Sequence, residues 1–208
     1  MAISLHHHPF TRATTAHWML EEVGVDYALH YVDLKAGAHK APEFLAVNPM
    51  GKVPTLIDGE VVITESAAIG LYLADRYAPG VLSPALDDPA RAAYLRWSLF
   101  GSAVVEPAAY ARQADWDYSA SSAGWGTFEE MNTTLDHAIG DGPFLLGDRF
   151  TMADVILGAT VRFLLMFGML DKRPVLEGYV ERLQARPAWR RSSVANAAII
   201  AERGLATR

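Results

Sequence analysis

The hydrophobic period changes repeatedly over residues 1–79, which is typical of short strands alternating with short helices. Residues 3–7 and 27–34 each alternate in the manner of a strand. Between them, residues 11–23 have helical spacing, and Gly24 follows at a position where a left-handed residue commonly ends a helix. Two strands joined through a helix are expected to be parallel, so the pattern predicts a βαβ unit with a right-handed crossover.

A hairpin pattern follows the βαβ unit. Apolar runs at 55–57 and 61–63 flank the turn sequence Asp-Gly-Glu at 58–60, and glycine tolerates the positive φ that a tight turn needs. Residues 66–77 then have the spacing of a helix that stops before a Pro-Gly pair. Together with the βαβ unit, these elements predict an α/β domain built on one sheet.

Strand patterns stop after residue 79, and helical periodicity fills most of the remaining chain. Residues 80–89 are rich in Pro, Gly, Ser and Asp, a composition typical of a linker. The sequence therefore predicts two domains, an α/β domain over 1–79 and an all-helical domain over 90–208. Helices are expected at about 90–115, 124–140, 152–168, 174–186 and 188–200.

Composition and charge exclude several classes of protein. Apolar residues make up 51% of the 208 residues and charged residues 20%, the proportions of an ordinary globular protein. The net charge is −6 and no basic stripe is interleaved with aromatic residues, so we expect no nucleic-acid partner. The sequence shows no signal-peptide pattern and contains no run of about 18 apolar residues. We therefore expect a cytoplasmic protein without a membrane partner. We interpret a basic cluster near the end of the chain as a solvated helix face: Arg182, Arg186, Arg190 and Arg191.

The sequence contains no cysteine. This excludes disulfides, thiolate metal sites and a protein thiol nucleophile, so any sulfur chemistry must use a bound thiol. Three histidines are consecutive at 6–8, but on a strand His7 faces away from the other two. They cannot readily converge on one ion, and we expect no metal site.

Several residues of the α/β domain could bind a small extended peptide. A cis Val53–Pro54 bond is expected just before the hairpin, although only about 5 to 6% of X-Pro bonds are cis. Such a turn would leave the N–H and C=O groups of Val53 free to pair with a bound peptide. Glu65 could attract an ammonium group beside Ser66, which begins a predicted helix whose N–H groups favour an anion. Taken alone, Glu65 and Ser66 are also what a simple helix cap requires.

Three cationic residues, His39, Lys40 and Lys52, lie on predicted loops of the same domain. They would bind a carboxylate if they converge and would face solvent if they do not. Thr11 lies where the first strand meets the first helix, a place where α/β sheets bind ligands and helix N-termini favour negative charge. Its hydroxyl could donate to an anionic sulfur or could cap the helix.

Four motifs in fixed order, at residues 5–22, 37–54, 63–77 and 150–155, carry a resemblance to a known family. The last is a predicted capping box in which Thr151 is the N-cap and Asp154 replaces the commoner Glu. Each motif is loose alone, but the four together are specific, and the chain resembles a cytosolic glutathione S-transferase over nearly its whole length. It is most similar to the serine-type, phi/theta-like bacterial members of that family.

The resemblance implies a thioredoxin-like N-terminal domain that binds glutathione and an all-α helical-bundle C-terminal domain, usually in a homodimer. It also implies one catalytic residue, Thr11, at the position of the family serine that stabilises the glutathione thiolate. The residues implied to hold glutathione, in the order cysteinyl, γ-glutamyl and glycyl site, are Val53 and Pro54, then Glu65 and Ser66, then His39, Lys40 and Lys52.

The activity implied by the resemblance is conjugation of glutathione, as co-substrate, to a small hydrophobic electrophile without a metal. Two residues depart from the family pattern: threonine replaces serine at 11, and Thr15 stands where many relatives have arginine. The branched Cβ of threonine restricts χ1 and thereby the reach of its hydroxyl. Two alternatives stay open, namely glutathione-dependent isomerisation or dehalogenation, and a protein of this fold that binds without catalysis.

Overall fold

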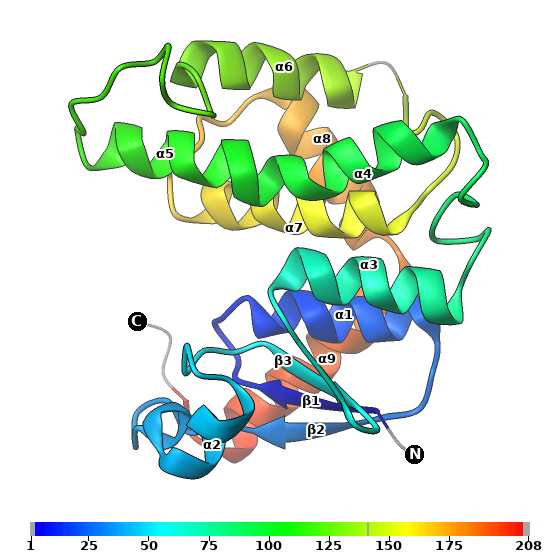
Figure 1. Cartoon of the computed structure of the whole chain (residues 1–208), viewed down its shortest axis with the longest axis vertical. Helices are drawn as coiled ribbons and strands as arrows, with labels where there is room; N and C mark the ends of the chain where they lie inside the picture. Colours follow the sequence, from blue (N-terminus) through cyan, green and yellow to red (C-terminus); the bar gives the residue numbers. More distant parts are fainter. Residues whose placement is uncertain (1–2, 141, 206–208) are drawn as a thin grey trace. The chain divides into compact units, whose positions relative to one another are not determined.

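The computed structural model describes residues 3–140 and 142–205. The chain divides into two compact units, Met1–Tyr77 with Arg186–Arg208, and Ala78–Ala185 (Figure 1). The expected fold class, a thioredoxin-like α/β part and a helical part, is confirmed. The expected extent of the helical domain, 90–208, differs from these units, because the last helix, α9 (Pro187–Glu202), groups with the sheet.

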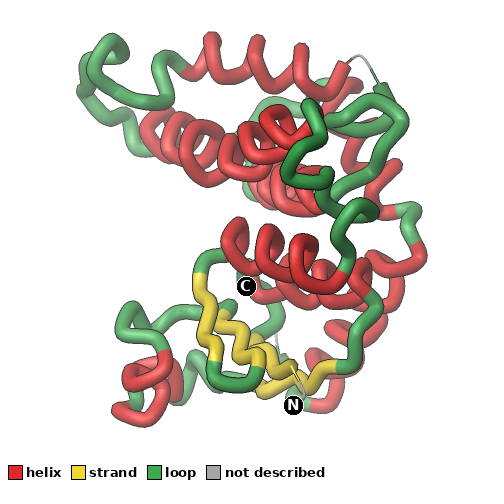
Figure 2. The backbone as a smooth tube through the Cα atoms, turned by 45° about the vertical axis from the view of Figure 1, so that its right-hand side comes forward, coloured by secondary structure: helices red, strands yellow, loops and turns green. Residues whose placement is uncertain are grey.

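The sheet of the first unit has the strand order β2-β1-β3-β4. Its strands are the yellow segments in Figure 2. The strands are β1 (Ile3–His7), β2 (Tyr27–Tyr31), β3 (Thr55–Asp58) and β4 (Val61–Thr64). β1 and β2 are parallel, with Ile3 opposite Tyr27, and β3 and β4 form the predicted hairpin. β2 ends at Tyr31, earlier than expected, and leaves Leu34 in the turn that follows.

Three helices of this unit pack together, since α1 (Ala13–Val23) contacts both α3 (Ser66–Tyr77) and α9. Between β2 and β3 the chain forms a short 3-10 turn (Ala38–Lys40) and then α2 (Pro42–Val47). We expected loops in this segment. A helix of 6 residues is shorter than two turns, so it shows no helical period in the sequence.

The core of the first unit lies between the sheet and the helices α1 and α3. Leu5 of β1, Leu56 of β3, Trp18 of α1 and Ile69 of α3 are almost completely buried. Burial of each such side chain contributes about 1.5 to 3 kcal/mol. This packing fixes the start of α1 next to the end of β1, and Thr11 lies in the connection between them.

The second unit contains only helices as regular structure in its described residues. They are α4 (Ala90–Phe100), α5 (Glu106–Gln113), α6 (Phe128–Gly140), α7 (Met152–Met166) and α8 (Pro174–Gln184). The single helix expected at 90–115 is interrupted by a π-helical turn, Gly101–Val105. Gly101 lies against α7, where an added Cβ would come within 3.1 Å of the Thr160 hydroxyl oxygen.

The predicted capping box at the start of α7 is confirmed. The Asp154 carboxylate accepts hydrogen bonds from the N–H groups of Thr151 and Leu145, each at 2.8 Å. It also accepts a hydrogen bond from the Tyr179 hydroxyl at 3.0 Å. Burial raises the pKa of Asp154, while these donors act in the opposite direction. The carboxylate therefore joins the start of α7 to the preceding loop and to α8.

Within residues 3–140 and 142–205, no helix is long and apolar enough to cross a membrane.

Candidate functional site

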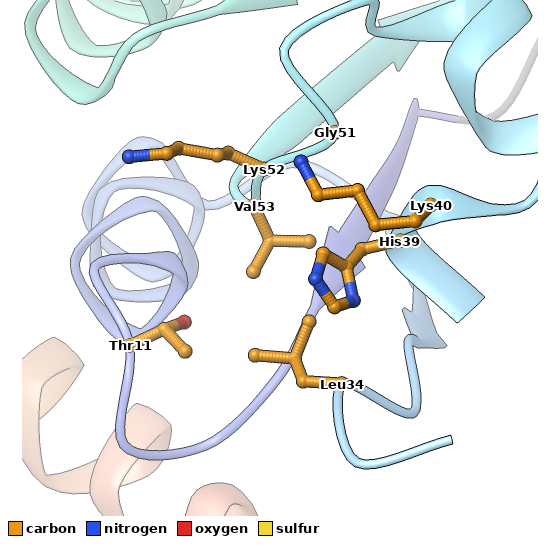
Figure 3. Close-up of a pocket in the computed structure, with 7 residues that line it drawn as sticks. All are labelled: Thr11, Leu34, His39, Lys40, Gly51, Lys52 and Val53. Carbon is orange, nitrogen blue, oxygen red and sulfur yellow. The ribbon is translucent and has the colours of Figure 1, made fainter. Parts of the chain in front are cut away.

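A cavity of about 280 Å³ opens in the first unit beside the start of α1 (Figure 3). Its lining comes from four separate segments of the chain: Thr11, Leu34, His39 with Lys40, and Gly51 with Lys52 and Val53. Every ionisable side chain in this lining is a histidine or a lysine. The cavity is therefore suited to an anionic ligand.

Of the site residues predicted from the sequence, the structure brings five into this lining: Thr11, His39, Lys40, Lys52 and Val53. Pro54, Glu65 and Ser66 lie in the same unit but do not line the cavity. Sequence reasoning missed Leu34 and Gly51. Leu34 was assigned to a strand, and no pattern marked it as a lining residue, whereas the Met-Gly-Lys turn around Gly51 was a usable signal.

The Thr11 hydroxyl makes two local hydrogen bonds. It donates to the His8 carbonyl at 2.7 Å and accepts from the Ala13 N–H at 3.1 Å. A hydroxyl has one proton, so in this arrangement the Thr11 hydroxyl already uses its only proton in the hydrogen bond to the His8 carbonyl. His8 is itself fixed, because its Nδ1 is 2.9 Å from the Val32 carbonyl and must donate to it. Thr11 therefore reaches a bound anion only by transferring its hydrogen bond from His8 to that anion.

The loop before β3 is organised by two buried polar residues, Asn48 and Thr55. The Asn48 amide nitrogen donates to the Lys52 carbonyl at 2.8 Å and to the Thr55 hydroxyl oxygen at 3.0 Å. The Thr55 hydroxyl donates to the same Lys52 carbonyl at 3.1 Å. The Val53–Pro54 bond that follows is cis, as the sequence predicted. These bonds position Lys52 and Val53 in the cavity, a role for Asn48 that the sequence pattern did not reveal.

Gly51 allows a close approach of chain segments in this loop. Its φ is +58°, and an added Cβ would lie 2.6 Å from the His39 carbonyl oxygen and 2.7 Å from the Lys40 ammonium nitrogen. That ammonium donates to the Met50 carbonyl at 2.9 Å. Lys40 therefore ties the two loops together, so that only part of its charge is available to a ligand.

His39 and Lys52 differ from Lys40 in having polar side-chain atoms that are not engaged by another residue of the described chain. The Nδ1 atom of His39 is buried and has no hydrogen-bond partner among the described residues. The Lys52 side chain is exposed and, in the same part of the chain, makes no hydrogen bond or ion pair. Both groups can therefore turn to an anionic ligand without breaking a contact.

Glu65 and Ser66 form the start of α3. The Glu65 carbonyl accepts the first helical hydrogen bond, from Ile69 at 2.9 Å, so Glu65 takes the N-cap position and Ser66 is the first helical residue. Glu65 has a φ of +64°, which is uncommon for a residue other than glycine. The first N–H groups of α3 lack intrahelical partners and present partial positive charge. This helix start can bind a carboxylate, while the Glu65 side chain is exposed beside it.

The three histidines of β1 follow the strand alternation. His7 is fully buried, whereas His6 and His8 are partly exposed, so they do not converge. In the described residues, no group of three His, Asp or Glu side chains is arranged to hold a metal ion.

Family models match both parts of the chain. The model described as glutathione S-transferase, N-terminal domain, matches residues 1–75, and the model described as glutathione S-transferase, C-terminal domain, matches residues 107–191. Glutathione S-transferase theta-2B of Homo sapiens is 33% identical over 193 residues, which cover 80% of this chain and 70% of that protein. Glutathione S-transferase F14 of Arabidopsis thaliana is 29% identical over 202 residues, covering 87% and 78%.

Solved structures agree with the sequence relatives. A glutathione transferase from Methylococcus capsulatus has a TM-score of 0.76 and 30% identity, over 95% of this chain and 100% of that one. A theta class glutathione S-transferase from Xanthomonas axonopodis pv. citri, solved with glutathione bound, has a TM-score of 0.72 and 32% identity, over 92% and 96%.

Proposed function

Because the chain belongs to the glutathione S-transferase family, we propose that it conjugates the thiolate of glutathione to a small hydrophobic electrophile. The observation that carries this proposal is the cavity at the start of α1, where the ionisable lining is basic and a hydroxyl is present. Glutathione carries two carboxylates and, when activated, a thiolate. Groups that attract negative charge lie within the same unit. They are the imidazole of His39, whose Nδ1 has no partner in the described residues, the exposed ammonium of Lys52 and the N-terminus of α3.

We assign the glutathione contacts as follows. The backbone N–H and C=O of Val53 pair with the cysteinyl unit, as an added strand would, next to the cis Pro54. His39 and Lys52 bind the glycyl carboxylate. The first N–H groups of α3, from Ser66 onward, bind the γ-glutamyl carboxylate.

The remaining γ-glutamyl group is an ammonium, which we assign to the exposed Glu65 carboxylate. Lys40 contributes mainly by holding the loop through Met50.

In the proposed mechanism, the bound thiol loses its proton to solvent and the thiolate attacks the electrophile while the enzyme stabilises the negative sulfur. The new carbon–sulfur bond forms as a leaving group departs with its electron pair or, in an addition, as a double bond of the electrophile takes up the pair and then a proton from solvent. A free thiol has a pKa of about 8.5, so about 3% is thiolate at pH 7. The Thr11 hydroxyl transfers its hydrogen bond from the neutral His8 carbonyl to the charged sulfur, since bonds to charged groups are about twice as strong. The positive end of α1 acts in the same direction, and holding both substrates close supplies further rate.

The test is a titration of glutathione bound to the protein, followed by the ultraviolet absorbance of the thiolate, together with conjugation assays on a panel of electrophiles. We expect the pKa of the bound thiol to lie about one to two units below that of free glutathione. Lys52→Ala is the matched variant for binding: it should weaken glutathione affinity and leave the pKa of the bound thiol unchanged. A bound thiol that keeps its solution pKa would contradict the catalytic proposal.

That last outcome would favour a second candidate function, a binding protein of this fold without catalysis. The specific observation in its favour is the hydrogen bond from Thr11 to His8, because a hydroxyl that keeps this bond does not activate the sulfur. The homodimer and the cytoplasmic location expected from the family resemblance are part of the same proposal. Sedimentation of the purified protein and its localisation in cells test them.

A further inference from the structure

Helix α9 is held against α1 by a continuous chain of hydrogen bonds that begins and ends on α9 itself. The Asn196 amide nitrogen is 3.1 Å from His17 Nδ1, and His17 Nε2 is 2.7 Å from the Tyr27 hydroxyl oxygen. The Tyr27 hydroxyl donates to the Glu21 carboxylate. The Arg191 guanidinium of α9 donates to the same carboxylate at 2.5 Å. His17 is completely buried at the centre of this chain.

The partners of His17 require its neutral form. The Asn196 amide nitrogen also donates to the Ser192 carbonyl at 2.7 Å, an acceptor only, so the amide cannot turn round without placing two oxygens together. His17 Nδ1 must therefore accept from Asn196, and its single proton lies on Nε2, toward Tyr27. A second proton on Nδ1 would face the N–H group of Asn196 and break this link between α1 and α9.

A second buried histidine lies beside the first. The rings of His7 on β1 and His17 are 5.6 Å apart and nearly perpendicular. His7 is completely buried, and neither of its ring nitrogens has a hydrogen-bond partner in the described part of the chain. Charging this imidazole would place a cation in the core next to another histidine, with only the neutral side-chain amide of Asn196 favouring the charged form.

The carboxylates on α1, near the two histidines, already form ion pairs with arginines. On α1 and α9, Glu21 pairs with Arg191, and Glu22 pairs with Arg186 at 2.7 Å. On β1, the neighbouring histidine is His8.

On β3, Asp58 lies opposite Ile3, at the far end of β1 from His7. Its carboxylate already accepts hydrogen bonds from Tyr72 and Tyr77 of α3 and pairs with Arg76. Within residues 3–140 and 142–205, these three carboxylates are already paired with arginines and are not free to neutralise a charged His7.

We propose that α9 is an acid-released latch on the thioredoxin-like unit, docked while His7 and His17 are neutral and released when they are protonated. None of the latch residues lines the cavity beside the start of α1, so the latch is separate from the proposed conjugation site. It also does not depend on glutathione. Arg186 and Arg191, which we interpreted as part of a solvated face, are the charged ends of the latch.

The direction of the pH effect follows from burial. Burial, and then the neighbouring His17, lower the pKa of His7 to about 4, although the Asn196 amide acts in the opposite direction. Burial also lowers the pKa of His17, against the effect of Glu21. A group with a lowered pKa binds its proton more readily in the released state, so docking is strongest above about pH 6.5 and weakens toward pH 4.

The experiment measures amide hydrogen exchange of the full-length protein at pH 7.5 and pH 5, corrected for the intrinsic pH dependence of exchange. Protonation of His7 should raise the opening of α9 at pH 5 by up to about 30-fold, the value reached when the released His7 regains its unperturbed pKa. Helix α7 of the second unit is the internal reference and should show no such increase. Equal opening of α9 at both pH values would overturn the proposal, and so would a parallel increase in α7, which would indicate global unfolding.

His7→Leu removes one titrating group and should reduce the acid response at least fivefold. His137→Gln, which replaces an exposed histidine of α6, is the control and should keep the full response. A full response in His7→Leu would overturn the role of the histidine pair. If His7→Leu does not fold, the comparison of α9 with α7 in the unmodified protein still decides whether the latch exists.

Discussion

Replacing Thr11 by valine removes the hydroxyl and keeps the branched shape of the side chain. In the ligand-free protein this hydroxyl donates to the His8 carbonyl at 2.7 Å. When the thiolate is bound, the same proton turns to the sulfur, so the stabilisation gained is the difference between two hydrogen bonds. A bond to a charged group contributes about 1.5 to 3 kcal/mol and a neutral bond about 0.5 to 1.5 kcal/mol. The net preference for the thiolate is then about 1 to 1.5 kcal/mol.

One pKa unit corresponds to about 1.4 kcal/mol, so Thr11→Val should raise the pKa of the bound thiol by about one unit. Below that pKa, conjugation should slow about tenfold, because the rate follows the thiolate fraction. The two proteins should converge at a pH above both pKa values. The assay is the pH profile of kcat/KM for one electrophile, with the thiolate absorbance measured in parallel. Thr11→Ser keeps a donor and is the matched control.

Two results would refute this reasoning in different ways. An unchanged thiol pKa in Thr11→Val would assign the activation to backbone N–H groups at the start of α1. A rise of two units or more would contradict the competition with His8, since the full strength of a charged hydrogen bond would then be realised. Loss of the bond from Ala13 should also lower the free energy of unfolding by about 1 kcal/mol, which urea denaturation measures separately.

Two further substitutions test the supports of the site and of the second unit. Gly51→Ala places a Cβ 2.6 Å from the His39 carbonyl oxygen at a positive φ, so glutathione affinity should fall at least tenfold by calorimetry, and unchanged affinity would contradict the close approach. Asp154→Ala leaves two buried N–H groups and the Tyr179 hydroxyl without an acceptor, and the free energy of unfolding should fall by at least about 3 kcal/mol in urea denaturation. A loss below about 1 kcal/mol would show that water replaces the carboxylate.

Local patterns in the sequence predicted much of the fold. The strand at β1, the hairpin of β3 and β4, and the capping box at Thr151 each depend on residues close together in the chain. The parallel pairing of β1 with β2 was also predictable, because the intervening helix requires it. Short or interrupted elements were missed, since α2 has 6 residues and the π-helical turn at Gly101 leaves the helical period almost unchanged.

The candidate site was predicted in part for the same reason. Thr11, His39 and Lys52 follow recognisable turns and helix starts, and the structure places them around one cavity. Leu34, which the sequence pattern placed in a strand, lies in the turn after β2 and is also part of the lining. The proton of Thr11 could not be assigned from the sequence, because its acceptor is a backbone carbonyl whose position depends on how the loop folds.

By itself, the sequence determined the types of elements, their order and the residues able to bind an anion, because propensity and periodicity act within a few residues. Only the tertiary structure decided that α9 belongs to the sheet unit, where Arg186 and Arg191 meet Glu22 and Glu21 across more than 160 residues of chain. Any arginine can pair with any carboxylate, so charge alone does not select a partner. The packing of α9 on α1 makes that selection, and it also buries His17 where its protonation state matters.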